Sequence, residues 1–330
     1  MQPANEPLQR PPGVIGSLRA GFDTVAAHIG LILMPLLLDL WIWLGPRLSI
    51  ERIFSDLRPD LAEVWRTAGV PAADLQTLMQ WYESTVHSIN LFWLLRTAPI
   101  GVSSLLLGRD VARTPLGAAS TWQVQAATFP AWILVLVLAG WVAGSLYFRW
   151  VAGLSVRSTG AAILPAQRAV FQTLLLSLIW AGAALSLAVP TLIIVGLLLQ
   201  LNVLLAQIVI LALSFFSMWL IVPLFFWPHG IFVKQQNALL SMLSSIQMAR
   251  FTLPSSSFFV LSVVLLGVGL NFLWNAAPTE SWMTLVGILG HAFITTALLA
   301  ASFIYYQQMT TWLETLLQRI RTAGTAAKRA

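Results

Sequence analysis

One stretch of the sequence, Ala169 to Val233, contains no Asp, Glu, Lys or Arg over 65 consecutive residues. Because a transmembrane helix needs about 20 apolar residues, two crossings and a turn fit inside this stretch. A water-soluble helical hairpin of this length would need a charged face on each helix, and none is present. The sequence therefore predicts a protein that crosses a membrane more than once.

The overall composition agrees with this interpretation. The chain is 58% hydrophobic and 9% charged, whereas about 25% of the residues of a soluble domain are charged. The net charge is +6, and Arg supplies 16 of the 18 basic residues. These residues flank apolar runs, which favours a role in membrane orientation over nucleic-acid binding. The absence of Cys excludes disulfides, thiolate metal sites and cysteine nucleophiles.

The apolar runs predict an all-α bundle of six transmembrane helices arranged as three hairpins. A cytoplasmic tail with a lead-in helix is expected at 1–25, the first span at 26–44 and a helical insertion at 45–130. Spans two to six follow within 131–306, at 131–150, 171–198, 203–227, 258–274 and 282–306, and an amphipathic tail occupies 307–330. Pro35 and Pro190 are expected to kink the first and third spans.

The insertion holds 14 of the 30 charges of the chain. Within it, the apolar positions Leu75, Leu78, Tyr82, Val86 and Ile89 recur at helical spacing and predict a buried helix face. The segment 89–107 is apolar but contains Arg96 and Pro99. Because an Arg at the centre of a membrane helix costs about 2.5–3.5 kcal/mol, we interpret this segment as interfacial or buried against the bundle. A re-entrant path stays open as an alternative.

The distribution of basic residues predicts the orientation of the chain. If both termini are cytoplasmic, the inner side carries eleven basic and three acidic residues, and the short outer loops carry no Lys or Arg. This is the bias expected of proteins in the cell membrane. The insertion then lies on the extracytoplasmic side.

Three segments with similar sequences precede the predicted hairpins. They are Ser17–Phe22, Ala166–Phe171 and Ile246–Phe251, and each places an Arg near an aromatic residue. They indicate either a threefold internal repeat or the common composition of helices that enter a membrane. This plan resembles a loose group of uncharacterised multi-span bacterial membrane proteins, including the membrane domain attached to some glycerophosphodiester phosphodiesterases. The resemblance covers the spans only; it implies a fold, and no catalytic domain or functional residue comes with it.

Asp39 is the only acidic residue inside a predicted span, which makes it the candidate for an intramembrane polar site. Helical rise places His291 and Asn271 in the same outer half of the bundle, with Gln207 as a further candidate member. The alternative is that Asp39 reaches the lipid headgroups or lies against other polar groups without a function. Separately, Gly140 and Gly144 form a GxxxG pair, which we expect to pack against a neighbouring span.

The sequence contains no metalloprotease, nucleophile-elbow, Walker or dinucleotide-binding motif, and its four His residues have no metal-ligand spacing. We therefore expect no enzymatic activity, no metal and no cofactor. Two functions remain: a scaffold or accessory protein that binds membrane lipid, protein partners or further copies of itself, and a small transporter or permease-like subunit with a polar site between spans. An apolar interior would favour the first.

Overall fold

The computed structural model describes residues 11–156 and 164–327. Several predicted features lie outside these residues. They are the first ten residues of the N-terminal tail, Arg157 in the loop after the second span, and the basic residues Lys328 and Arg329.

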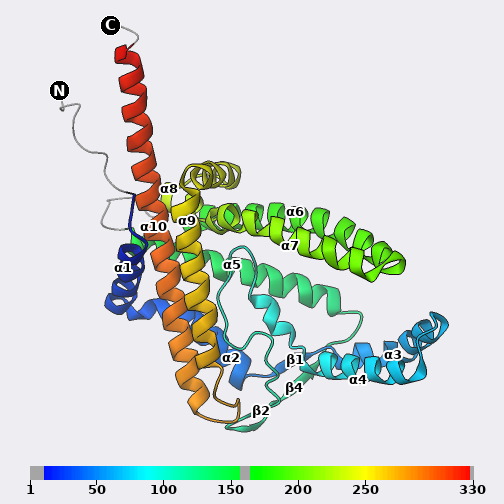
Figure 1. The fold of residues 1–330 in the computed structure, drawn as a ribbon. Coiled ribbons are helices and arrows are strands. Elements are labelled where there is room, and N and C mark those ends of the chain that lie inside the picture. Colours follow the sequence, from blue (N-terminus) through cyan, green and yellow to red (C-terminus); the bar gives the residue numbers. More distant parts are fainter. Residues whose placement is uncertain (1–10, 157–163, 328–330) are drawn as a thin grey trace. The chain divides into compact units, whose positions relative to one another are not determined.

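The described part of the chain is predominantly helical (Figure 1), so the prediction of an all-α fold is confirmed. The helices are α1 Val14–Ala27, α2 Leu33–Leu44, α3 Glu51–Thr67, α4 Ala72–Ser88, α5 Phe129–Ser155, α6 Ala166–Leu201, α7 Val203–Phe226, α8 His229–Lys234, α9 Ala238–Trp274 and α10 Met283–Ala327. Two 3-10 turns, η1 Ile29–Ile32 and η2 Leu91–Leu95, and four short strands complete the set: β1 Arg47–Ser49, β2 Arg113–Thr114, β3 Gly117–Ala118 and β4 Thr121–Gln123.

Four of these helices, α5, α6, α9 and α10, are long and apolar enough to cross a membrane. Two bent pairs, α1 with residues 29–44 and 203–217 with 220–234, raise the number to six if each pair is one span. The chain is therefore a membrane protein. The predicted C-terminal tail is a direct continuation of α10, whose 45 residues extend about 68 Å, more than twice the hydrocarbon thickness.

The helix breaks differ from the proline kinks expected from the sequence. Pro35 lies in the first turn of α2, where its missing N–H costs nothing, and the break falls upstream at His28. Helix α6 continues through Pro190 without interruption. In α9 the non-helical residue is Thr252, two positions before Pro254, consistent with the restriction that a proline places on the residues before it.

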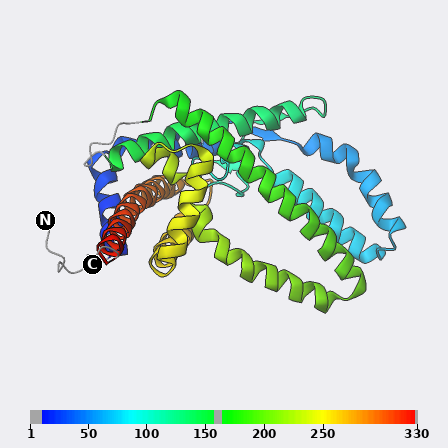
Figure 2. The same cartoon turned by 90° about the horizontal axis from the view of Figure 1, so that it is seen from above.

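Asn202 forms the turn between α6 and α7, at the place where the sequence predicted one. It ends α6, and its side chain accepts hydrogen bonds from the N–H groups of Leu204 (2.8 Å) and Leu205 (3.2 Å) at the start of α7. This is a standard N-cap for the second helix. The two helices form a hairpin that opens away from this turn (Figure 2).

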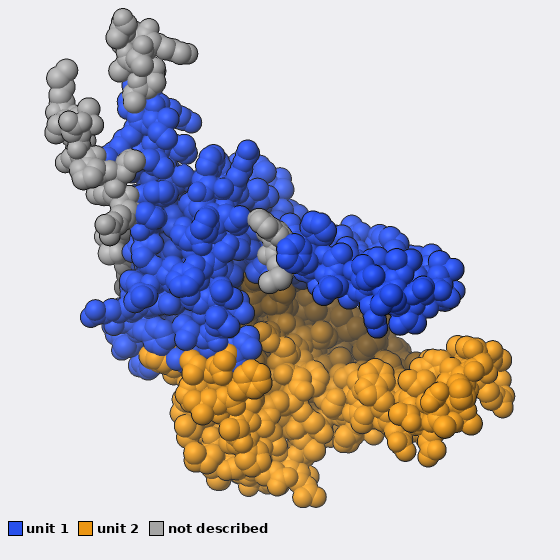
Figure 3. Space-filling view, viewed as in Figure 1, with its two compact units in different colours: residues 1–31, 148–268, 294–330 blue, residues 32–147, 269–293 orange. Residues whose placement is uncertain are grey.

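The chain divides into two compact units (Figure 3). Unit 1 comprises residues 1–31, 148–268 and 294–330, and unit 2 comprises residues 32–147 and 269–293. Unit 1 has an aromatic core in which the rings of Phe259 and Tyr305 stack at 4.1 Å between centroids, and Phe226 and Tyr306 pack beside them. Offset aromatic pairs of this kind add to the energy of apolar burial.

Unit 2 contains the insertion, which is helical only in its first half. Helices α3 and α4 pack together, with Val86 and Met79 of α4 buried and the other predicted positions of this face half-buried or buried. Residues 96–128 contain no helix; they carry a parallel ladder between β1 and β4 and an antiparallel one between β2 and β3. The expectation of a mostly helical insertion is therefore wrong for this half. Its glycines and prolines, such as Pro99 and Gly108, oppose helix formation.

Arg47 of β1 ties the start of the insertion to its later parts. Its guanidinium donates to the carbonyl oxygen of His87 at 2.6 Å and pairs with Asp110 at 3.1 Å, and its side chain is 6% exposed. Next to it, the buried side chain of Asn90 accepts from the N–H groups of Leu48 (3.1 Å) and Phe92 (3.2 Å). These bonds hold β1, the end of α4 and the loop around Asp110 together.

We predict that Arg47→Leu destabilises the insertion by about 1–3 kcal/mol, because it leaves the His87 carbonyl and Asp110 without their buried partner. Limited proteolysis of the purified protein should then cleave within 45–130 faster than in the parent. Arg52→Leu, at an exposed position of α3, is the matched control and should leave the cleavage rate unchanged. Equal cleavage rates in the two variants would contradict the prediction.

Candidate functional site: a buried carboxylate and the loop that it holds

Asp39, the predicted intramembrane acid, is fully buried on α2 within unit 2. Its carboxylate accepts hydrogen bonds from the Ser104 hydroxyl, from the N–H of Leu105 at 2.9 Å and from the N–H of Leu106 at 3.3 Å. All three donors belong to one short segment without helix or strand. Because each donor points at the carboxyl oxygens, the arrangement suits the ionised form of the group. Asp39 thus supplies the acceptors for this turn of the backbone.

The chain immediately before this turn packs against the middle of α5. A Cβ atom added at Gly140 would lie 2.6 Å from the Leu95 carbonyl oxygen, and one at Gly144 would lie 2.7 Å from the Cα of Gly101. The two glycines are about 16 and 22 Å along α5 from Phe129, at 1.5 Å per residue. Within the segment 89–107, the stretch from Leu95 to Gly101 therefore packs against a helix of the bundle.

The Gly140–Gly144 pair does allow close packing, but its partner differs from the one expected. The sequence predicted a neighbouring span, whereas both glycines contact the irregular chain from Leu95 to Gly101. The indole N–H of Trp141 also donates to the carbonyl oxygen of Ala98, at 3.3 Å. A helix face lined with glycine accepts an irregular backbone as readily as a second helix, because only the distance of approach matters.

The other predicted site residues are arranged in two places. His291 of α10 and Asn271 of α9 are joined through the His291 Nδ1 and Asn271 Oδ1 atoms at 2.8 Å. Both belong to unit 2, as Asp39 does. Gln207, in contrast, is an exposed residue of α7 in unit 1. The structure brings Asn271 and His291 together, whereas the Asp39 carboxylate accepts its hydrogen bonds from the loop at Ser104 to Leu106.

Sequence reasoning missed the residues that satisfy Asp39. Two of the three donors are backbone N–H groups, which every residue other than Pro carries, so no residue type could signal them. Ser104 lies 65 positions from Asp39, in a segment that has no periodicity. The only indication was the general rule that a buried carboxyl group needs a hydrogen-bonding partner.

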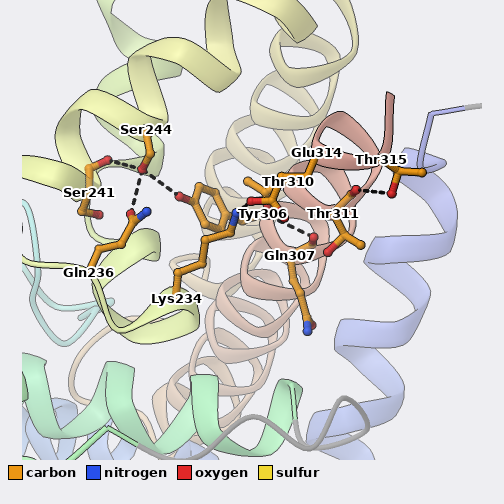
Figure 4. Close-up of polar contacts among 10 residues, drawn as sticks. All are labelled: Lys234, Gln236, Ser241, Ser244, Tyr306, Gln307, Thr310, Thr311, Glu314 and Thr315. Carbon is orange, nitrogen blue, oxygen red and sulfur yellow. Dashed lines mark hydrogen bonds and ion pairs between the residues drawn. The ribbon is translucent and has the colours of Figure 1, made fainter. Parts of the chain in front are cut away.

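A second polar cluster, in unit 1, was also not predicted (Figure 4). The Ser244 hydroxyl donates to the Gln236 side-chain oxygen at 2.8 Å and lies 3.3 Å from the Tyr306 hydroxyl. Lys234 at the end of α8 forms an ion pair with Glu314 of α10. These contacts hold the connection between α8 and α9 against α10. The polar side chains of this cluster therefore have a structural role in a unit whose core is apolar.

The loop between α9 and α10 is held by two further residues of unit 2. Arg109 donates to the Asn275 side chain at 3.1 Å and to the Ala277 carbonyl oxygen at 3.0 Å, and the Trp43 indole donates to the Thr279 carbonyl oxygen at 2.8 Å. Among the described residues, no group of three or more His, Cys, Asp or Glu side chains is placed to hold a metal ion.

Comparison of the chain with protein families, with curated proteins and with solved structures finds no match. The resemblance to the phosphodiesterase-associated membrane domain therefore stays a prediction from the sequence.

We predict that Asp39→Asn lowers stability by about 1–3 kcal/mol, because an amide offers one acceptor oxygen where the carboxylate offers two, and its NH₂ group faces N–H donors. Asp39→Leu should cost more, since it removes every acceptor. The thermal midpoint of the detergent-solubilised protein measures both. Asp23→Asn is the control, because the Asp23 side chain is 71% exposed. A midpoint unchanged in Asp39→Leu would show that the turn does not depend on this group.

A second prediction concerns the glycine contact. Gly144→Val should destabilise the protein by about 1–3 kcal/mol, because its side chain would overlap the backbone of Gly101. Gly182→Val in α6 is the matched control, since nothing lies within 4 Å of a Cβ atom there. The same thermal measurement compares the two. Equal losses of stability in the two variants would mean that valine destabilises these helices through its low helix propensity rather than through a steric clash.

Proposed function

We propose that the protein is a non-enzymatic scaffold or accessory protein of the cell membrane. In this proposal it crosses the membrane six times, with both termini in the cytoplasm, and it binds lipid or partner proteins through its extracytoplasmic insertion. The observation that supports the proposal is the structural role of Asp39. The three hydrogen bonds from Ser104, Leu105 and Leu106 commit this carboxylate to holding the chain in place.

The distribution of apolar and polar groups supports the same function. Each unit has an apolar core, and a cleft of about 430 Å³ lies between α3 and α4. A transport site needs polar groups that face water along a path through the bundle. A scaffold needs a stable bundle and an accessible surface outside it.

One observation favours the transporter as a second candidate. Asp39, Arg96 and His291 all belong to unit 2. Proton-linked carriers use buried acid and imidazole groups of this kind. This candidate requires that Asp39 exchange a proton, which would turn one of its two acceptor oxygens into an O–H donor and weaken its hydrogen bonds to the loop.

The topology can be tested directly because the chain has no native Cys. Single cysteines at Ser55, Gln167 and Thr315, all at exposed positions, are labelled in intact cells with a membrane-impermeant thiol reagent. Only the Ser55 position should react, and all three should react after lysis. Labelling of Gln167 or Thr315 in intact cells would overturn the proposed orientation.

The scaffold and the transporter are separated by two measurements on the same protein. We expect native mass spectrometry to find bound lipid or a protein partner, and to lose it when residues 51–88 are replaced by a short Gly–Ser linker. In liposomes we expect no proton flux above that of protein-free vesicles. A flux that is present in the parent and absent in a well-folded Asp39→Asn variant would support the transporter and contradict the scaffold.

A further inference from the structure

We infer that the α3–α4 hairpin lies along the outer leaflet of the membrane, with the side that carries Leu57, Val64 and Trp81 in contact with zwitterionic lipid. This inference deepens the proposed function and rests on its orientation of the insertion. It names the surface of the insertion that binds lipid and the class of lipid that it binds.

The first observation is the exposure of large apolar side chains on a hairpin that otherwise carries many charges. Leu57 is 45% exposed, Val64 59% and Trp81 65%. Single exposed apolar residues are ordinary. Three on one hairpin, including a Trp, require a reason if they share one face.

The second observation is that the hairpin has two different sides. The cleft between α3 and α4 is lined by Glu51, Ser55 and Arg58 from α3 and by Glu83 and His87 from α4, among others. Across it, Arg58 pairs with Glu83 at 2.7 Å and Glu51 with His87 at 3.6 Å. This is the polar side, which suits contact with water.

Helical geometry places the exposed apolar residues on the opposite side. At 3.6 residues per turn, Leu57 and Val64 point about 140° away from the mean direction of the cleft residues of α3. Trp81 points about 140° away from Glu83 and His87 of α4. Because the two helices are antiparallel and packed against each other, these directions fall on the same face of the hairpin.

The contact between the helices fixes these directions. The Tyr82 hydroxyl donates to the Phe54 carbonyl oxygen at 2.9 Å, and the rings of these two residues are 6.1 Å apart. Val86 is buried in the same core. With these residues between the helices, neither helix can rotate to hide its exposed apolar side chains without breaking the packing.

The membrane is the natural occupant of this face, because the hairpin is tethered beside it. Only six residues separate the end of α2 at Leu44 from the start of α3 at Glu51. The strand within that link, β1, pairs with β4, which leads into α5 at Phe129. The base of the hairpin is therefore held at the ends of two membrane helices. Trp is the residue type enriched where a surface meets the headgroups.

Charge selects the class of lipid. Residues 51–88 contain three Arg and six Asp or Glu, a net charge of −3 with His neutral. Asp60 and Asp74 lie on the apolar side by the same helical geometry. An anionic surface would repel this hairpin, whereas a zwitterionic one offers ammonium groups to the carboxylates.

The test uses the parent protein with single cysteines and nitroxide labels, in phosphatidylcholine vesicles. Leu57→Cys, Val64→Cys and Trp81→Cys probe the apolar side, and Ser55→Cys and Ser84→Cys are matched controls on the cleft side. All five positions are exposed, so folding is preserved. We expect the ratio of collision with lipid-dissolved oxygen to collision with an aqueous nickel chelate to be several-fold higher at the three apolar-side positions.

Three results would overturn the inference. Equal access of the nickel chelate at all five positions would show that the hairpin projects into water. Protection of the apolar-side labels from both reagents would show that protein, including a second copy of the chain, covers this face. An unchanged ratio in vesicles rich in phosphatidylglycerol at low salt would contradict the preference for zwitterionic lipid, since we expect the ratio to fall there.

The same variants distinguish this inference from the orientation on which it rests. Impermeant thiol labelling of Ser55→Cys in intact cells reports the side of the membrane, and the collision ratio reports lipid contact. Lipid contact without labelling of Ser55→Cys in cells would overturn the proposed orientation and leave a lipid-bound hairpin on the inner leaflet. Labelling in cells without lipid contact would leave the orientation and overturn the inference.

Discussion

A backbone without regular structure can lie among membrane helices only if the protein itself satisfies its N–H and carbonyl groups. In unit 2 this requirement falls on Asp39, whose carboxylate accepts from the N–H groups of Leu105 and Leu106. The glycines of α5 meet the complementary steric requirement, since they let the chain around Gly101 approach the helix closely. One ionisable side chain and one glycine-lined face together make an irregular segment compatible with an apolar bundle.

Glycines of α6 show that a small residue does not by itself specify a contact. Nothing lies within 4 Å of a Cβ atom at Gly182 or Gly196, whereas Gly140 and Gly144 are in tight contact. The four glycines occur in helices of similar apolar composition. The difference is that an irregular segment of the chain packs against Gly140 and Gly144, and no described segment packs against Gly182 or Gly196. Sequence alone shows which faces permit close packing, and the partner decides which of them are used.

Much of the helical framework could be predicted from the sequence, because apolar length and turn residues act locally. The bounds of α7, the C-terminal end of α9 and the Asn202 turn follow from this kind of information. The path of residues 96–128 could not be predicted, since it depends on pairings such as that of β1 with β4, which lie more than 70 residues apart. For the candidate site, the hydrogen bond between His291 and Asn271 agrees with a depth argument from helical rise. The hydrogen bonds of Asp39 to backbone N–H groups could not be predicted, because backbone N–H groups do not depend on the residue type.

The distribution of charge around and along a helix separates the surroundings that suit α3, α6 and α10. Helix α6 has no buried residue in its most apolar window, and it presents apolar side chains in all directions, the pattern of a helix surrounded by lipid. Helix α3 has charged residues on one side and exposed Leu57 and Val64 on another, which suits a boundary between lipid and water. Helix α10 changes along its length, from buried Ile288 and Ala292 to exposed Arg319 and Arg321. The surroundings that suit each helix therefore follow from where its charges lie as well as from how apolar it is.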